Sequence, residues 1–168
     1  MQAIAQVIPS QPHLNALIVG APEDTPSNQE YYQKLRRLVS ELDLSNHVIL
    51  TGFWADIPQI MAASDILVHS VSLPEPFGRV IVEGMLAKRP VVATAAGGVL
   101  DSIEDQVTGL LVPLQNPSKM AETILWVINH PEQAVCMGET AQQKAKERFS
   151  IEQHVFSIQQ IYQKNLNV

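Results

Sequence analysis

The sequence predicts an α/β domain with three layers, in which helices cover both faces of a mainly parallel sheet. Short runs rich in β-branched residues alternate with amphipathic stretches, and this alternation is typical of βαβ units. The runs LIV, ILV and VVA are apolar at every position, as expected of strands that are buried on both faces of a parallel sheet. The last third of the chain is helical throughout.

Five strands are predicted, over residues 13–20, 47–52, 65–70, 90–94 and 108–113. In a parallel α/β sheet, ligands bind outside the carboxyl ends of the strands. The loops that follow the first four strands are therefore the candidate functional segments. They cover residues 20–28, 52–56, 70–78 and 94–101.

Helices are predicted between and after the strands, over residues 28–44, 56–64, 79–87, 116–130, 131–147 and 151–165. Apolar residues at three- and four-residue spacing indicate the first of them. Asp56 and Ser150 are predicted N-caps, and Pro58 lies in a first turn. The opening residues MQAIAQVIPSQPHLN predict the end of a helix followed by a turn, without the pattern of a signal peptide.

Composition excludes several functional classes. The length predicts a single domain over residues 1–168, and the formal net charge of −6 argues against binding to nucleic acid, which depends on Lys and Arg. Five scattered histidines give no metal-ligand spacing, so no metal site is predicted. The single cysteine, Cys136, excludes an internal disulfide and fits a reducing, cytoplasmic compartment. No apolar run approaches the length of a membrane span.

The stretch SLPEPFGRVIVEGM at residues 72–85 combines two carboxylates with the start of a helix. Pro76 forces an extended backbone at Glu75, so that this side chain can point into a cleft. Gly78 lets a ligand approach, and the free N–H groups of the following helix can bind an anion. Ionised Glu75 and Glu83 would accept hydrogen bonds from sugar hydroxyls. Each acid also has an alternative interpretation without a ligand. Glu75 would be an exposed acid in a loop, and Glu83 would stabilise the positive end of the helix dipole.

Two other loops carry candidate residues. Phe53 and Trp54 have two alternative interpretations: their rings pack in the core at a strand end, or they form a wall beside the flat base of a ligand. Gly97 and Gly98 form a tight turn or a nest of N–H groups for phosphate. The sequence contains no G-x-G-x-x-G and no Walker lysine motif, so a dinucleotide site or a P-loop is not predicted.

These residues resemble the C-terminal, donor-binding domain of family-4 retaining glycosyltransferases with the GT-B fold. EPFGRVIVE is similar to the E-x7-E motif of that family, with Glu75 and Glu83 as its two acids. The resemblance covers nearly the whole chain, through VILTGFWADIPQIMAASDILVHSVSLPEPFG, PVVATAAGG, VTGLLVPLQNPSKMAETI, MGETAQQKAKERFS and SIEQHVFSIQQIYQKNL. Two positions depart from the family pattern: Gly84 stands where Ala is usual, and Lys88 stands where Gly is usual.

The resemblance implies a Rossmann-like half of a GT-B enzyme that binds a UDP-sugar or another nucleoside diphosphate sugar. Glu83 would bind the ribose, and Glu75 would be the catalytic residue that faces the donor sugar. The implied binding residues are Gly20, Phe53, Trp54, Glu75, Pro76, Phe77, Gly78, Arg79, Val80, Glu83, Gly97 and Gly98. No metal or cofactor is implied.

The resemblance further implies sugar transfer to an acceptor hydroxyl with retention, in polysaccharide or glycoconjugate synthesis. The N-terminal acceptor domain and the phosphate-neutralising Arg and Lys of the family precede the first residue of this sequence, so the chain is expected to be a half-enzyme that transfers poorly alone. Peripheral contact of the full enzyme with a membrane stays open. The alternatives are a flavodoxin-like interaction module without nucleotide binding, a GT-B sugar-nucleotide epimerase and, more remotely, a two-carboxylate glycosidase.

Overall fold

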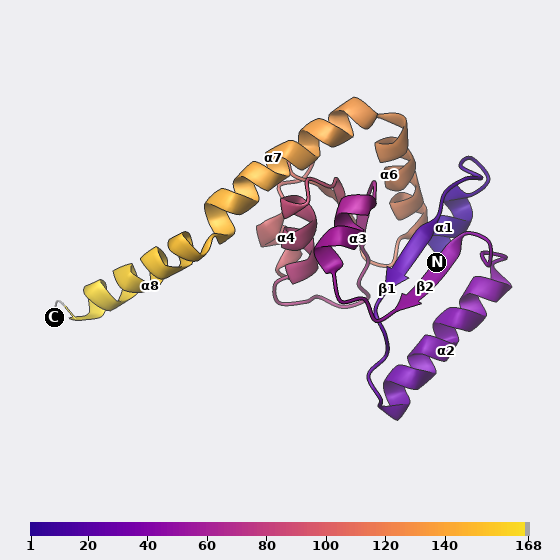
Figure 1. Ribbon diagram of the computed structural model, residues 1–168. Coiled ribbons are helices and arrows are strands. Elements are labelled where there is room, and N and C mark those ends of the chain that lie inside the picture. The colour runs from indigo at the N-terminus through magenta and orange to yellow at the C-terminus, as the bar shows by residue number, and fades with distance from the viewer. Residues whose placement is uncertain (167–168) are drawn as a thin grey trace. The chain divides into compact units, whose positions relative to one another are not determined.

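The computed structural model describes residues 1–166 (Figure 1). The chain forms two compact units, Met1–Ile57 with Gln115–Trp126 and Pro58–Leu114 with the chain from Val127 on. Each unit has its own parallel sheet, of two and three strands. The single domain over 1–168 stays a prediction, and its last two residues lie outside the described part of the chain.

The first unit contains a two-stranded sheet and the helices around it. Its elements in chain order are α1 (Gln2–Val7), β1 (Ala16–Val19), α2 (Pro26–Glu41) and β2 (Val48–Gly52). The Thr25 side chain caps α2 by accepting a hydrogen bond of 3.3 Å from the Asn28 N–H. Val39, Leu44 and Val48 form a buried hydrophobic cluster in this unit.

The second unit contains the three-stranded sheet, with strand order β3-β4-β5. Its elements are β3 (Leu67–His69), α4 (Arg79–Leu86), β4 (Val91–Thr94), α5 (Val99–Ser102), β5 (Leu110–Val112), α7 (Pro131–Phe149) and α8 (Ile151–Leu166). Two of the boundaries between the units along the sequence fall within further helices, α3 (Ile57–Ala63) and α6 (Pro117–Asn129). The central strand β4 is buried at all four positions, which places the core of this unit between its sheet and the helices α4 and α7.

The two departures from the family pattern have local explanations near the C-terminal end of α4. A Cβ atom at Gly84 would lie 2.2 Å from Leu67 Cδ2, so glycine lets α4 pack directly against β3. Lys88 follows the helix with a φ of 58°, in the left-handed region that glycine adopts most easily. The Arg89 and Lys88 N–H groups bond to the carbonyls of Gly84 and Met85, each at 3.0 Å, which is the Schellman pattern of a helix end.

Every predicted helix and strand is present, with its ends shifted by up to three residues. The strand expected over 13–20, for example, is Ala16–Val19. The predicted cap of α8 is confirmed, because Ser150 Oγ accepts from the Gln153 N–H at 3.1 Å. The short helix α5 was expected as loop. Among the described strands, burial on both faces holds for β4 only. In β1, Leu17, Ile18 and Val19 are exposed, and in β3, Val68 is exposed.

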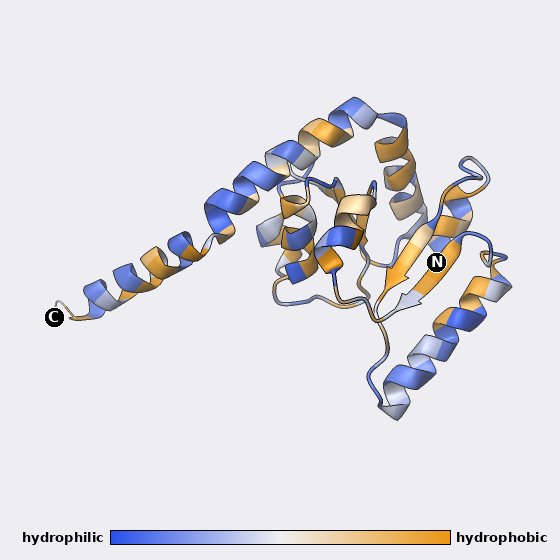
Figure 2. Ribbon diagram, viewed as in Figure 1, coloured by the Kyte–Doolittle hydropathy of each residue, from blue (hydrophilic) through white to orange (hydrophobic). Residues whose placement is uncertain are grey.

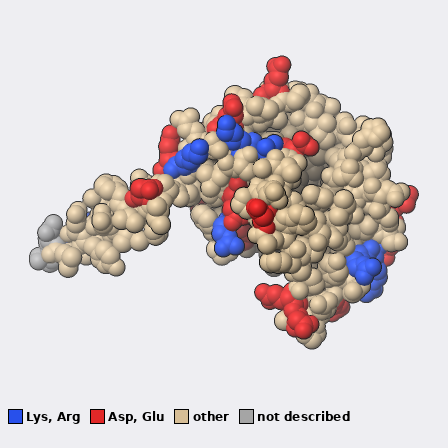
Figure 3. Space-filling model, in the orientation of Figure 1, with Lys and Arg blue, Asp and Glu red and all other residues tan. Residues whose placement is uncertain are grey.

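Helix α8 has no buried residue, and apolar and polar residues alternate along it (Figure 2). Charged side chains are scattered on the face shown in Figure 3, where Lys and Arg form no continuous basic surface. None of the helices within residues 1–166 combines the length and apolar character that crossing a membrane requires.

Candidate functional site

The predicted acidic loop leads directly into α4, and a left-handed glycine makes the junction. Gly78 is the N-cap of α4, with φ 79° and ψ 54°. A Cβ atom there would lie 2.9 Å from Ile81 Cδ1 and 3.2 Å from Glu75 Oε1. Glycine therefore permits both the turn and the close return of the Glu75 carboxylate. The Ile81 N–H donates to the Gly78 carbonyl at 2.9 Å, whereas the N–H groups of Arg79 and Val80 have no acceptor within the helix and can face a ligand.

Glu75 is also fixed through its backbone, by the glycine loop at the carboxyl end of β4. Its carbonyl accepts a hydrogen bond of 2.9 Å from the Gly98 N–H, and Glu75 and Gly97 form a parallel bridge. A Cβ atom at Gly97 would lie 2.3 Å from the Glu75 carbonyl oxygen. The two glycines thus serve a close loop contact, and the Gly98 N–H is already used within it. The hypothesis of a phosphate nest gains no support at Gly98.

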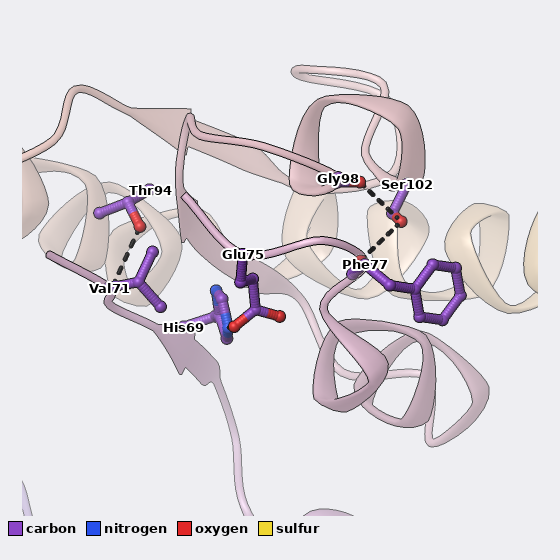
Figure 4. Close-up of polar contacts among 7 residues, drawn as sticks. All are labelled: His69, Val71, Glu75, Phe77, Thr94, Gly98 and Ser102. Carbon is purple, nitrogen blue, oxygen red and sulfur yellow. Dashed lines mark hydrogen bonds and ion pairs between the residues drawn. The ribbon is translucent and has the colours of Figure 1, made fainter. Parts of the chain in front are cut away.

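The segment after Glu75 is held from two further elements, α5 and α7, and Figure 4 shows the contacts made by Ser102 of α5. Ser102 Oγ on α5 lies 3.4 Å from the Phe77 carbonyl oxygen and 3.2 Å from the Gly98 carbonyl oxygen, and its single hydroxyl proton is shared between them. The Phe77 ring meets Phe149, the last residue of α7, edge to face with centroids 5.6 Å apart. Phe77 is half exposed, and the Val80 side chain packs against the core. The loop is therefore anchored on both sides of Gly78.

The Glu75 carboxylate has a partner that the sequence analysis did not single out. His69 Nε2, at the end of β3, lies 3.1 Å from Glu75 Oε2. The His69 side chain is 8% exposed and the Glu75 side chain 33% exposed. Beside this pair, the buried Thr94 Oγ1 accepts from the Val71 N–H at 3.1 Å (Figure 4). A lone histidine in an apolar strand was the only signal for His69 in the sequence.

Glu83 lies one turn into α4 on the surface of this unit. Its Oε1 is 3.3 Å from Arg79 Nε, an i,i+4 pair whose side chains are 40% and 88% exposed, respectively. An exposed pair of this kind contributes little to stability, about 0–1 kcal/mol. Both side chains are thus open to solvent and accessible to a ligand.

Three predicted residues, Gly20, Phe53 and Trp54, lie in the first unit. Gly20, with φ 136°, donates its N–H to the Gly52 carbonyl at 3.1 Å, and Gly52 has φ 68°. Phe53 is 80% exposed, and Trp54 is also exposed. The alternative that placed the Phe53 ring in the core is therefore wrong, because the chain turns outward after β2. An exposed ring remains available to a flat ligand.

The second unit brings together the predicted residues Glu75, Pro76, Phe77, Gly78, Arg79, Val80, Glu83, Gly97 and Gly98. Within residues 1–166, no group of three or more His, Cys, Asp or Glu side chains is arranged to hold a metal ion.

Comparison with known proteins agrees with this arrangement. Residues 1–144 match the family described as "Glycosyl transferases group 1", and the chain belongs to this family. The trehalose synthase of Thermococcus litoralis is 33% identical over 147 residues, which cover 86% of this chain and 35% of that protein. The alpha-1,3/1,6-mannosyltransferase ALG2 of Homo sapiens is 33% identical over 139 residues, which cover 79% of this chain and 32% of that protein.

Solved structures of glycosyltransferases share the fold. The crystal structure of HepE from Anabaena in complex with UDP superposes with a TM-score of 0.87 and 37% identity, over 99% of this chain and 43% of that one. HepE was also solved in complex with UDP-glucose. The C-terminal domain of a group 1 glycosyltransferase from Francisella tularensis has the same fold, with a TM-score of 0.76 over 89% of this chain and 77% of that one.

The predicted α/β fold class and the resemblance to the C-terminal domain of GT-B glycosyltransferases are thus confirmed. The chain spans 35% of the length of the trehalose synthase and 43% of that of HepE.

Proposed function

We propose that this chain is the donor half of a retaining glycosyltransferase and binds a nucleoside diphosphate sugar, with UDP as the nucleotide. The observation that carries the proposal is the likeness to HepE, which was solved with UDP and with UDP-glucose, at 37% identity over 99% of this chain. The surface that would hold the donor is the one already described, where Glu75 and Glu83 flank the start of α4.

Each end of such a donor has a chemically suitable partner in the second unit. The N–H groups at the start of α4 would hold phosphate or sugar oxygens, since a helix N-terminus favours negative charge. Glu75 would accept hydrogen bonds from the donor sugar, and the exposed Glu83 would accept them from the ribose hydroxyls. Arg79 would bring a positive charge to the same surface.

The transfer step would rest on positioning and charge stabilisation. To retain the configuration, the acceptor hydroxyl would approach the anomeric carbon on the face from which the diphosphate departs. The new C–O bond would form as the bond to the diphosphate breaks, and the hydroxyl proton would pass to the departing diphosphate. The diphosphate brings negative charge to a chain of net charge −6. The N–H groups at the start of α4 and the guanidinium of Arg79 would offset part of this charge.

The acceptor is not defined by this domain, because relatives of similar identity act on different substrates. Trehalose synthase, a mannosyltransferase and N-acetyl-alpha-D-glucosaminyl L-malate synthase all match the chain. We propose an acceptor hydroxyl in polysaccharide or glycoconjugate synthesis, in the cytoplasm, where the exposed Cys136 would stay reduced.

The proposal is tested by titrating the chain with UDP, GDP, ADP and UDP-glucose. Calorimetry serves for tight binding, and ligand-observed NMR serves if the Kd is millimolar. We expect selective binding of UDP and UDP-glucose that Glu83→Ala reduces and Glu139→Ala, an exposed acid on α7, leaves unchanged. Equal binding of all nucleotides would contradict the choice of UDP. Absence of binding to any of them would favour the interaction-module alternative.

A further inference from the structure

We propose that His69 is a positioning residue that orients the Glu75 carboxylate toward the donor sugar. This inference rests on the proposed function, because it assigns a task to the residue that would face that sugar. It starts from one contact: His69 Nε2 lies 3.1 Å from Glu75 Oε2, and His69 is almost completely buried.

The surroundings of the imidazole determine which nitrogen carries the proton. Among the residues that the structure describes, His69 Nδ1 is a buried side-chain atom with no hydrogen-bond partner. A neutral imidazole has one donor and one acceptor nitrogen, and a buried N–H without an acceptor is costly. The proton therefore belongs on Nε2, where a carboxylate oxygen accepts it. In this tautomer His69 donates to Glu75 Oε2.

The contact leaves the second carboxylate oxygen for a ligand. Glu75 Oε1 lies 3.2 Å from the position that a Cβ atom on Gly78 would occupy, so it points toward the N-terminus of α4. Oε2 is the oxygen that His69 holds. One side of the carboxylate is thus fixed by β3, and the other is directed to the surface where the N–H groups of α4 would bind the donor.

The backbones of His69 and Glu75 are both held by hydrogen-bonded neighbours, so the orientation of the Glu75 carboxylate is well defined. His69 pairs in register with Ala93 of the buried strand β4. The Glu75 backbone is tied to Gly97 and Gly98 at the end of the same strand.

A purely structural role for His69 predicts different binding results from a positioning role, and two substitutions distinguish these roles. His69→Gln keeps an N–H donor near the position of Nε2, and His69→Leu fills similar space without a donor. A structural role affects the stability of the unit and therefore the binding of both UDP and UDP-glucose. A positioning role affects UDP-glucose alone, because UDP has no sugar beyond the diphosphate for Glu75 to contact.

The first experiment needs no ligand. The tautomer of His69 is read from imidazole ¹⁵N chemical shifts of the chain, and the His69→Gln spectrum identifies its signals among those of five histidines. We expect a proton on Nε2 and a change in this signal in Glu75→Ala. A proton on Nδ1 would overturn the inference.

The second experiment measures affinity for UDP and UDP-glucose in the wild type and both variants. We expect His69→Leu to lose about five- to tenfold in affinity for UDP-glucose, with UDP unchanged, as for the loss of one hydrogen bond of ordinary strength. His69→Gln should recover most of the loss. Equal losses for both ligands, or no loss, would overturn the inference and leave the proposed function standing. If neither ligand binds the wild type, the proposed function fails and the inference falls with it.

Discussion

A Cβ atom added to Gly98 would lie 2.0 Å from the carbonyl oxygen of Pro76. The loop that carries Glu75 and the loop that follows β4 are therefore packed as closely as two backbones allow. A bond from the Gly98 N–H to the Glu75 carbonyl runs in the same contact. We expect donor binding to depend on this contact, although Gly98 has no side chain that could touch the donor.

Gly98→Ala is expected to destabilise the chain by about 1–3 kcal/mol and to weaken binding of UDP-glucose, because the backbone of Pro76 has to move. Chemical denaturation and calorimetry measure the two effects. Leu100→Ala is the matched control, since Leu100 is exposed on the neighbouring helix α5. Unchanged stability in Gly98→Ala would mean that the loops are not packed as described.

Lys88→Gly is expected to stabilise the chain by about 0.5–1 kcal/mol, because glycine removes the cost of a left-handed residue at the end of α4. Lys88→Ala keeps a Cβ atom and loses only an exposed charge, so it should leave the free energy of unfolding nearly unchanged. Urea denaturation of the three proteins measures the difference. A Lys88→Gly variant no more stable than Lys88→Ala would contradict the strain at this position.

Phe149→Ala is expected to cost about 2–3 kcal/mol of stability and to weaken UDP-glucose binding, since Phe149 packs against the core and against the Phe77 ring. Phe156→Ala serves as the control, because Phe156 lies on α8, which has no buried residue. Thermal unfolding followed by circular dichroism compares the two. The same loss in both variants would show that α8 is packed in solution.

Arg79→Ala is expected to change the free energy of unfolding by less than about 0.5 kcal/mol, because its pair with Glu83 is exposed. UDP affinity should fall more at low than at high ionic strength, since an exposed charge is screened by salt. Titrations at two salt concentrations measure this dependence. A salt-independent loss would indicate that Arg79 acts through packing rather than through its charge.

Local patterns in the sequence were sufficient to predict the fold class and the placement of the two acids relative to the start of α4. The short-range periodicity of apolar residues predicts the alternation of strands and helices. The segment EPFGRVIVE places Glu75 before the helix that begins at Arg79, and Glu83 within it. The Ser150 cap was also predictable, because its bond to Gln153 spans three residues.

Contacts between distant segments were not predictable in this way. Gly98 meets Glu75 across 23 residues of sequence and Phe149 meets Phe77 across 72, and no local pattern links either pair. The sequence alone therefore did not distinguish a tight turn from a phosphate-binding nest at Gly97 and Gly98. His69 gave no signal because a single histidine in an apolar strand acquires a partner only when the following loop folds back onto it. The exposure of Phe53 depends likewise on how the chain leaves β2.

The central claim, a donor site at the start of α4, is tested most directly by mapping backbone amide shifts of the ¹⁵N-labelled chain during titration with UDP-glucose. At 18.5 kDa the chain suits this measurement. We predict that the largest changes fall on the N–H groups of Gly78, Arg79 and Val80 and on Glu83, and that Glu83→Ala reduces them. Saturable changes confined to other segments, with the start of α4 unaffected, would contradict the account.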